Sequence, residues 1–136
     1  MPNRVMGFDF GLKRIGIAIG QCVTQTANPL TILKAKNGTP EWSQIEKLLS
    51  EWAIDACVVG LPLNMDGSEQ PITHHAKQFG HLLTKKFHLP VYFVDERLTT
   101  IAAKDRMHST LKGQERFDPA DSVSAQMILE SWLRSQ

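Results

Sequence analysis

Three acidic positions, far apart in the sequence, stand where an apolar pattern does not require a charge. Asp9 interrupts the apolar segment V-M-G-F-D-F-G, where an unpaired buried carboxylate would be costly. Asp95 and Glu96 end the apolar segment V-Y-F-V, and adjacent strand residues face opposite sides, so only one of them can share a site with Asp9. Asp121 lies in the first turn of a predicted helix, where the helix dipole also favours an acid.

Carboxylates that converge on one edge of a sheet would repel one another unless a cation neutralised them. Hard oxygen ligands suit Mg²⁺ or Mn²⁺, and two such ions can activate a water and stabilise the leaving oxygen in phosphodiester hydrolysis. Asp9, one acid of the Asp95–Glu96 pair and Asp121 therefore predict a two-ion Mg²⁺ or Mn²⁺ site. The competing interpretation is that each acid is solvated or caps a local turn.

Basic residues near these acids could contact a phosphate backbone. Lys13 and Arg14 lie in a predicted turn close to Asp9, and Arg97 directly follows Glu96. The segment 97–116 has an excess of positive charge that could steer a nucleic acid, with Arg97, Lys104, Arg106, Lys112 and Arg116 against Asp105 and Glu115. For any single basic residue, a solvated surface position is the simpler explanation.

The segment L-P-L-N-M-D-G-S-E-Q-P, residues 61–71, follows a predicted buried strand at its carboxyl end. Sheets of mixed α/β proteins place their ligands at such ends. Asn64, Ser68 and Gln70 could form neutral hydrogen bonds with phosphate or sugar groups. The alternative is a tight turn built from the proline, aspartate and glycine of the same segment.

The elements that would position these residues follow from the apolar pattern. Residues 4–10, 15–20 and 29–35 predict three antiparallel strands, the first two joined by the turn G-L-K-R. Thr39-Pro40-Glu41 predicts a helix start, with Thr39 as the N-cap and Pro40 as the first helical residue. The apolar residues from Trp42 to Trp52 then recur at helical spacing.

The second half of the chain alternates between strands and helices. Two short apolar runs, at 56–60 and 91–94, predict buried strands. Helical spacing predicts a helix from Ala76 to Phe87 and a last helix that starts at Asp118-Pro119. Between the second strand and the last helix we expect a short helix at 100–107 and a polar loop at 108–116. The order βββ-α-β-α-β-α-α predicts an α/β protein with a ribonuclease H-like fold, a mixed five-stranded sheet flanked by helices.

Length and composition agree with one domain over residues 1–136. The formal net charge of +1 excludes a strongly basic nucleic-acid coat protein. Two cysteines are too few for a disulfide framework. The sequence contains neither an apolar stretch of the ~20 residues that span a membrane nor a signal peptide. We therefore expect a cytoplasmic protein with no membrane association.

Four sequence blocks occur in order along nearly the whole chain. They are F-D-F-G-x-K-x-I-G-x-A-x-G, V-V-G-L-P-L-N-M-D-G-S-E-Q-P, V-D-E-R-L-T-T and D-S-V-S-A-x-x-I-L-E-S. Together they resemble the bacterial YqgF family, also called pre-16S rRNA nuclease or Holliday junction resolvase-like. The resemblance implies a ribonuclease H-like fold, a cytoplasmic location and a hydrolase that matures the 5′ end of small-subunit ribosomal RNA.

The resemblance also places the acidic site on Asp9, on Glu96 with Asp95 as the alternative, and on Asp121. The expected partners are structured RNA or branched DNA, together with ribosomal precursor particles, and the expected state is a monomer or a weak homodimer. Two other functions stay open. One is resolution of four-way DNA junctions by a two-fold dimer. The other is a non-catalytic RNA-binding or ribosome-assembly module that kept the fold.

Overall fold

The computed structural model describes residues 3–96 and 119–136, with the side chains of the second range described from residue 123 onward. Along the chain the elements are β1 (Arg4–Asp9), β2 (Arg14–Gln21), β3 (Thr26–Lys36), β4 (Thr39–Pro40), α1 (Trp42–Glu51), β5 (Ala56–Leu61), α2 (Pro71–Phe87), β6 (Val91–Asp95) and α4 (Pro119–Arg134). No helix among these residues is long and apolar enough to cross a membrane.

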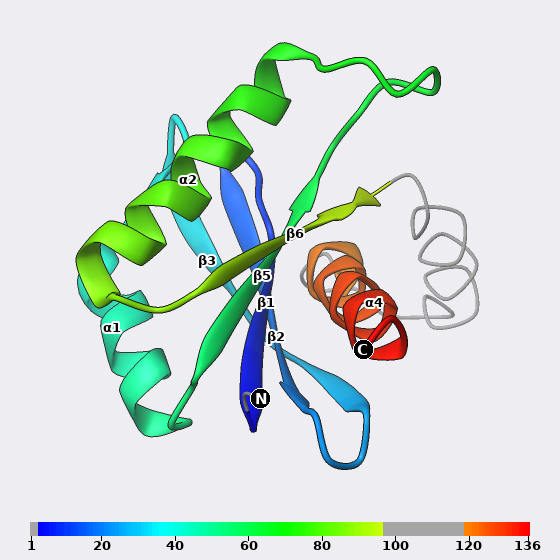
Figure 1. Ribbon diagram of the computed structural model, residues 1–136. Helices are drawn as coiled ribbons and strands as arrows, with labels where there is room; N and C mark the ends of the chain where they lie inside the picture. Colours follow the sequence, from blue (N-terminus) through cyan, green and yellow to red (C-terminus); the bar gives the residue numbers. More distant parts are fainter. Residues whose placement is uncertain (1–2, 97–118) are drawn as a thin grey trace.

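The strands form one mixed sheet in the order β4-β3-β2-β1-β5-β6. β1, β2 and β3 pair antiparallel as the predicted meander, whereas β5 pairs parallel with β1, and β6 pairs parallel with β5. Helices α1 and α2 cover one face of this sheet, and α4 lies against the other face (Figure 1). The carboxyl ends of β1, β5 and β6 therefore meet at one edge.

Two hydrophobic clusters hold these layers together. The α1/α2 cluster consists of Met6, Phe8, Phe10, Ile15, Ile17, Ile19, Ile45, Leu49, Ile54, Cys57, Val59, Ala76, Phe79 and Leu83. The α4 cluster consists of Val5, Ala18, Ala27, Ala56, Val58, Ala125, Ile128, Leu129, Trp132 and Leu133. Both faces of β1 and β5 are thus buried, which explains why these strands are nearly continuous apolar runs.

The predicted helix start at Thr39-Pro40-Glu41 is wrong. Thr39 and Pro40 form the short strand β4 and pair with Lys36 and Ala35 of β3. Helix α1 begins at Trp42, with Glu41 at its N-cap. Pro40 has no N–H for a sheet ladder, so it suits the edge strand as well as it would suit a first helical turn. This strand also raises the predicted strand number by one.

Other predicted elements are present with shifted bounds. β3 covers Thr26–Lys36, which is longer than the predicted 29–35, and its pairing with β2 shifts register between Ile17 and Ala18. α2 begins at Pro71, earlier than the predicted Ala76, and it ends at Phe87, where the C-cap residue His88 has a left-handed φ of 57°. Helix α4 begins at Pro119 as predicted. The predicted helix at 100–107 and loop at 108–116 lie outside the described residues.

Phe79 of α2 is the central aromatic side chain of the α1/α2 cluster. Its ring packs edge-on against Phe8, with the ring centroids 5.3 Å apart. It also contacts Phe10 at 5.3 Å and stacks on Trp42 of α1 at 5.6 Å. Phe79 is 2% exposed. This one side chain therefore joins both helices to β1.

We expect Phe79→Ala to lower the free energy of unfolding by about 3–5 kcal/mol, because it removes a buried ring and leaves a cavity. Leu82→Ala is the matched control on the same helix, since Leu82 is 39% exposed, and it should cost less than about 1 kcal/mol. Urea unfolding followed by circular dichroism measures both. Equal losses in the two variants would contradict the central place given to Phe79.

Candidate active site

Asp9 is the last residue of β1 and lies on the face of the sheet that α4 covers. Val5 belongs to the α4 cluster, and a Cβ added at Gly7 would lie 3.1 Å from Cβ of Leu129. Because side chains alternate along a strand, Asp9 faces the same side as Val5 and Gly7. Its register partner on β2 is Gly16. The Asp9 side chain is half-buried at the edge where β1 ends.

Glu96 lies on the same face, one residue beyond the end of β6. Val94 packs against the α4 cluster, so alternation turns Asp95 to the opposite face and returns Glu96 to the face of Val94. A Cβ added at Gly60 would lie 2.8 Å from Cγ of Glu96 and 2.5 Å from Cδ1 of Ile128. The Glu96 side chain therefore passes over Gly60, beside α4.

Helix α4 runs with its N-terminus toward this edge. Trp132, near its C-terminus, lies against Tyr92 at the start of β6, with ring centroids 5.1 Å apart. Ile128, one turn earlier, lies at Gly60 near the end of β5. The backbone of residue 121 is helical and lies one turn before Ala125, so it is nearer still to the carboxyl ends of the strands.

The structure thus places Asp9 and Glu96 on one face and at one edge of the sheet. The side chain of Asp121 lies outside the described residues, as does Arg97. Among the side chains that the structure describes, no group of three or more His, Cys, Asp and Glu could hold a metal ion together. The convergence of Asp121 with these two acids therefore stays a prediction.

Lys13 and Arg14 lie at the junction of β1 and β2, on the same edge of the sheet as Asp9. Both side chains are exposed. The carbonyl of Lys13 accepts a hydrogen bond of 2.8 Å from the N–H of Ala35, which ties the junction to β3. Arg14 is two residues before Gly16, the partner of Asp9, so it stands diagonally across from Asp9 on the same face.

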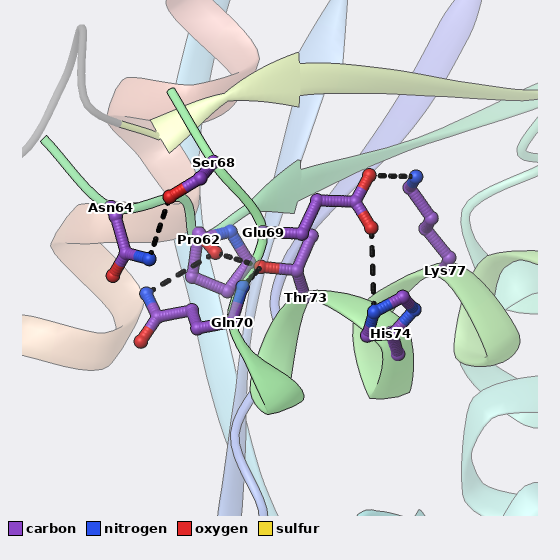
Figure 2. Close-up of polar contacts among 8 residues, drawn as sticks. All are labelled: Pro62, Asn64, Ser68, Glu69, Gln70, Thr73, His74 and Lys77. Carbon is purple, nitrogen blue, oxygen red and sulfur yellow. Dashed lines mark hydrogen bonds and ion pairs between the residues drawn. The ribbon is translucent and has the colours of Figure 1, made fainter. Parts of the chain in front are cut away.

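The segment 61–71 between β5 and α2 is a compact turn (Figure 2). Nδ2 of Asn64 donates to Oγ of Ser68 at 3.0 Å. The N–H and hydroxyl of Ser68 both donate to Oδ1 of Asp66, at 2.9 and 2.6 Å. Gly67 has a φ of 90°, which favours glycine. These bonds agree with the tight turn that the sequence left open for this segment.

Gln70 and Thr73 join this turn to the start of α2 (Figure 2). Nε2 of Gln70 donates to the carbonyl of Pro62 at 3.3 Å, and the hydroxyl of Thr73 donates to the same carbonyl. The N–H of Gln70 donates to Oγ1 of Thr73 at 3.1 Å. The amide groups of Asn64 and Gln70 therefore both have partners inside the turn, so a contact with a ligand would compete with these bonds.

Comparisons with known proteins bear on what such a site does. The sequence profile of the RuvX family, described as Holliday junction resolvase, matches residues 3–135. This chain belongs to the RuvX family. A relative from Nitrosococcus oceani named "Putative pre-16S rRNA nuclease" is 50% identical over 135 residues, 99% of this chain and 89% of the relative. One of the same name from Aeromonas salmonicida is 53% identical, over 97% of this chain and 95% of the relative.

Solved structures share the fold of this RuvX chain. RuvC of T. thermophilus in complex with a Holliday junction substrate superposes with a TM-score of 0.62 at 16% identity, over 98% of this chain and 94% of RuvC. The Holliday junction resolvase of fowlpox virus gives 0.56 at 15% identity, over 98% and 99%. The predicted ribonuclease H-like fold is confirmed, with six strands in place of the predicted five.

Two charged or reactive groups of the RuvX chain are explained by local structure. The Lys77 ammonium donates to the Glu69 carboxylate and lowers its pKa, and His74 lies 3.5 Å from the same carboxylate (Figure 2). Burial raises the pKa of the Cys57 thiol to about 12, so this group stays protonated near neutral pH and is a poor nucleophile. Both groups have structural roles.

Gly60 is a residue of the site that the sequence analysis did not single out. The signal was present in the run A-C-V-V-G, where a glycine ends an otherwise bulky buried strand, and such a glycine often marks a close approach. Here the approaching groups are Ile128 of α4 and Glu96. The small residue therefore allows a helix and a carboxylate to share the end of β5.

We expect Gly60→Ala to destabilise the protein by about 1–3 kcal/mol, because its Cβ would overpack against Ile128. Ile128→Val removes the Cδ1 atom that lies 2.5 Å from that Cβ, and alone it should cost about 0.5–1.5 kcal/mol. The double variant should lose less than the sum of the two single losses, because the second change relieves the first. Strict additivity in urea unfolding would show that the two positions are not in contact.

Proposed function

We propose that this chain is a divalent-metal-dependent endonuclease that hydrolyses phosphodiester bonds in the 5′-end maturation of pre-16S rRNA. The observation that carries the proposal is the shared position of Asp9 and Glu96 on the α4 face, where β1 and β6 end. Full-length similarity to relatives named as pre-16S rRNA nucleases supports the substrate. Such a substrate would place the protein in the bacterial cytoplasm, with ribosomal precursor particles as partners.

Asp9, Glu96 and Asp121 would hold the metal. The two described carboxylates are half-buried on one face, and carboxylate oxygens are the ligands that Mg²⁺ and Mn²⁺ prefer. Position 121 is four residues before Ala125, and helical periodicity puts it on the stripe of α4 that faces the sheet. When bound, one or two such ions would activate a water and stabilise the leaving oxygen.

The remaining site residues of the proposal contact the substrate. Lys13, Arg14 and Arg97 would bind phosphate groups, which orient a nucleic acid without reading its sequence. Asn64 and Gln70 would contribute only where a phosphate or sugar oxygen replaces a bond inside the turn. We propose that the protein acts as a monomer or a weak homodimer, since an RNA end imposes no two-fold symmetry.

The second candidate function is resolution of four-way DNA junctions. The description of the RuvX family supports it, and the same carboxylates would perform the same hydrolysis. A junction has two-fold symmetry, so this function would require a dimer whose two sites cut opposite strands. Assays of a precursor rRNA end and of a four-way junction with the same enzyme therefore separate the two functions.

We expect Asp9→Asn to abolish cleavage in Mg²⁺ or Mn²⁺, because it keeps the size of the side chain but removes a ligand charge. Without metal, its thermal midpoint should equal or exceed that of the wild type, since one of several repelling carboxylates is gone. The stabilisation that added Mn²⁺ gives to the wild type should shrink in the variant, because an ion that binds only the folded state stabilises it. Paired melting and cleavage assays measure all three effects.

Glu46→Gln is the control for this experiment, because Glu46 is exposed on α1, across the sheet from the site. It removes the same charge and should leave cleavage and the response to Mn²⁺ unchanged. Cleavage by Asp9→Asn at the wild-type rate would remove Asp9 from the mechanism. Binding of RNA without cleavage by wild type or variant, at any concentration of metal, would instead identify a non-catalytic RNA-binding module.

The adjacent acids Asp95 and Glu96 should differ sharply in their effect on cleavage. Glu96→Gln should lower the rate at least about 100-fold, equivalent to about 2.7 kcal/mol of transition-state stabilisation, because a metal ligand loses its charge. Asp95→Asn should cleave near the wild-type rate, since alternation turns this residue away from α4. The opposite ranking in a single-turnover assay would assign the ligand to Asp95.

A further inference from the structure

The chain between Asp9 and Glu41 contains no acidic residue, although it forms half of the sheet. Its charged side chains are all basic, namely Lys13, Arg14, Lys34 and Lys36. All of them are exposed. On the other side of β1, strands β5 and β6 carry no lysine or arginine. Apart from Arg4, at the end of β1 opposite to Asp9, the positive charges on the described strands therefore lie on β2 and β3.

The strand register puts these side chains on one face of the sheet. Arg14 of β2 is directly opposite Lys34 of β3. Leu33 and Ala35 pack against the α1/α2 cluster, so alternation turns Lys34 and Lys36 to the α4 face. This is the face of Asp9. The basic strip, defined as Arg14, Lys34 and Lys36, thus runs along the same edge of the sheet, from the strand next to Asp9 toward β4.

The spacing of the strip suits an extended polyanion. Neighbouring strands lie about 4.8 Å apart, so Lys34 on β3 is about 10 Å from β1, measured across the sheet. Lysine and arginine side chains are long enough to bridge such gaps. Beyond β3 lies a hollow of about 750 Å³ that is open to solvent, and its lining includes Lys34, Lys36 and Glu41.

We propose that Lys34 and Lys36 bind the phosphate backbone of the nucleic-acid strand as it continues from Asp9 along this edge of the sheet, past β2 and β3 toward β4. The inference rests on the proposed nuclease function and adds a direction to it. The nucleic-acid strand follows this direction because, among the described strands on either side of β1, only β2 and β3 carry lysine or arginine. Lys34 and Lys36 are positioning residues, and they do not take part in bond cleavage.

The test uses binding alone, in the Asp9→Asn background and without divalent metal, so that the substrate stays intact. Fluorescence anisotropy measures the affinity for a short labelled single-stranded RNA and for a four-way DNA junction over a series of salt concentrations. The variant is Lys34→Gln with Lys36→Gln. The matched control is Lys47→Gln with Lys85→Gln, which removes two exposed charges on α1 and α2, across the sheet from the strip.

We expect the strip variant to bind on the order of tenfold more weakly at 0.1 M salt, and its slope of log affinity against log salt to fall by about 1.4–1.8, the loss of two phosphate contacts. The control should keep the slope of the parent. Thermal midpoints should not fall in the strip variant, because Lys34 faces another cation across the strands. Equal slopes in strip variant and control would overturn the proposal.

Failure of this inference is distinct from failure of the proposed function. A strip variant that binds like the control, while protein with Asp9 intact cleaves RNA, would leave the nuclease in place and remove the strip. A reduced slope in the strip variant, while protein with Asp9 intact cleaves neither substrate, would keep the strip and overturn the nuclease.

Discussion

The burial of β1 on both faces is the constraint on which the rest of this structure depends. Met6 and Phe8 point into the α1/α2 cluster, and Val5 points into the α4 cluster. Such a strand cannot hold a charge in its interior without a large desolvation cost. Asp9 is tolerated because it stands where the strand emerges from between the two layers. The packing therefore determines where this strand can present a carboxylate at the edge of a dry core.

Close packing of α4 on the sheet also fixes the position of this helix relative to the ends of the strands. Leu129 lies over Gly7 and Gly20, and Ile128 lies over Gly60. Larger residues at these positions would lift the helix from the sheet and move the N-terminal turn of α4 away from Asp9. The glycines of the strands thus allow α4 to lie close to the sheet, and this contact sets the distance between the acidic positions on β1 and on α4.

The sequence predicted the helices and strands best where one physical signal dominated. The buried strands β1 and β5 follow from their continuous apolar runs, and α1 follows from the helical spacing of its apolar residues. Thr39-Pro40 was assigned wrongly because proline fits an edge strand and a helix start equally well. The choice between Asp95 and Glu96 depended on the register at the end of β6, where a shift of one residue exchanges the two faces. Only the contact of Glu96 with the Gly60 position shows which side it takes.

Helix α4 is far in the sequence from the strands that it covers, and this affects the order in which the protein folds during synthesis. Nε2 of Gln126 donates to the carbonyl of Ala27 at 2.9 Å, although the two residues are separated by most of the chain. The ribosome makes all six strands before it makes α4, and chains fold from the N-terminal side as they emerge. The face of the nascent sheet that α4 covers is therefore exposed until this helix has been synthesised. A chaperone that binds apolar surface would bind this face. Truncation before residue 119 would leave the same face exposed and give an aggregation-prone product.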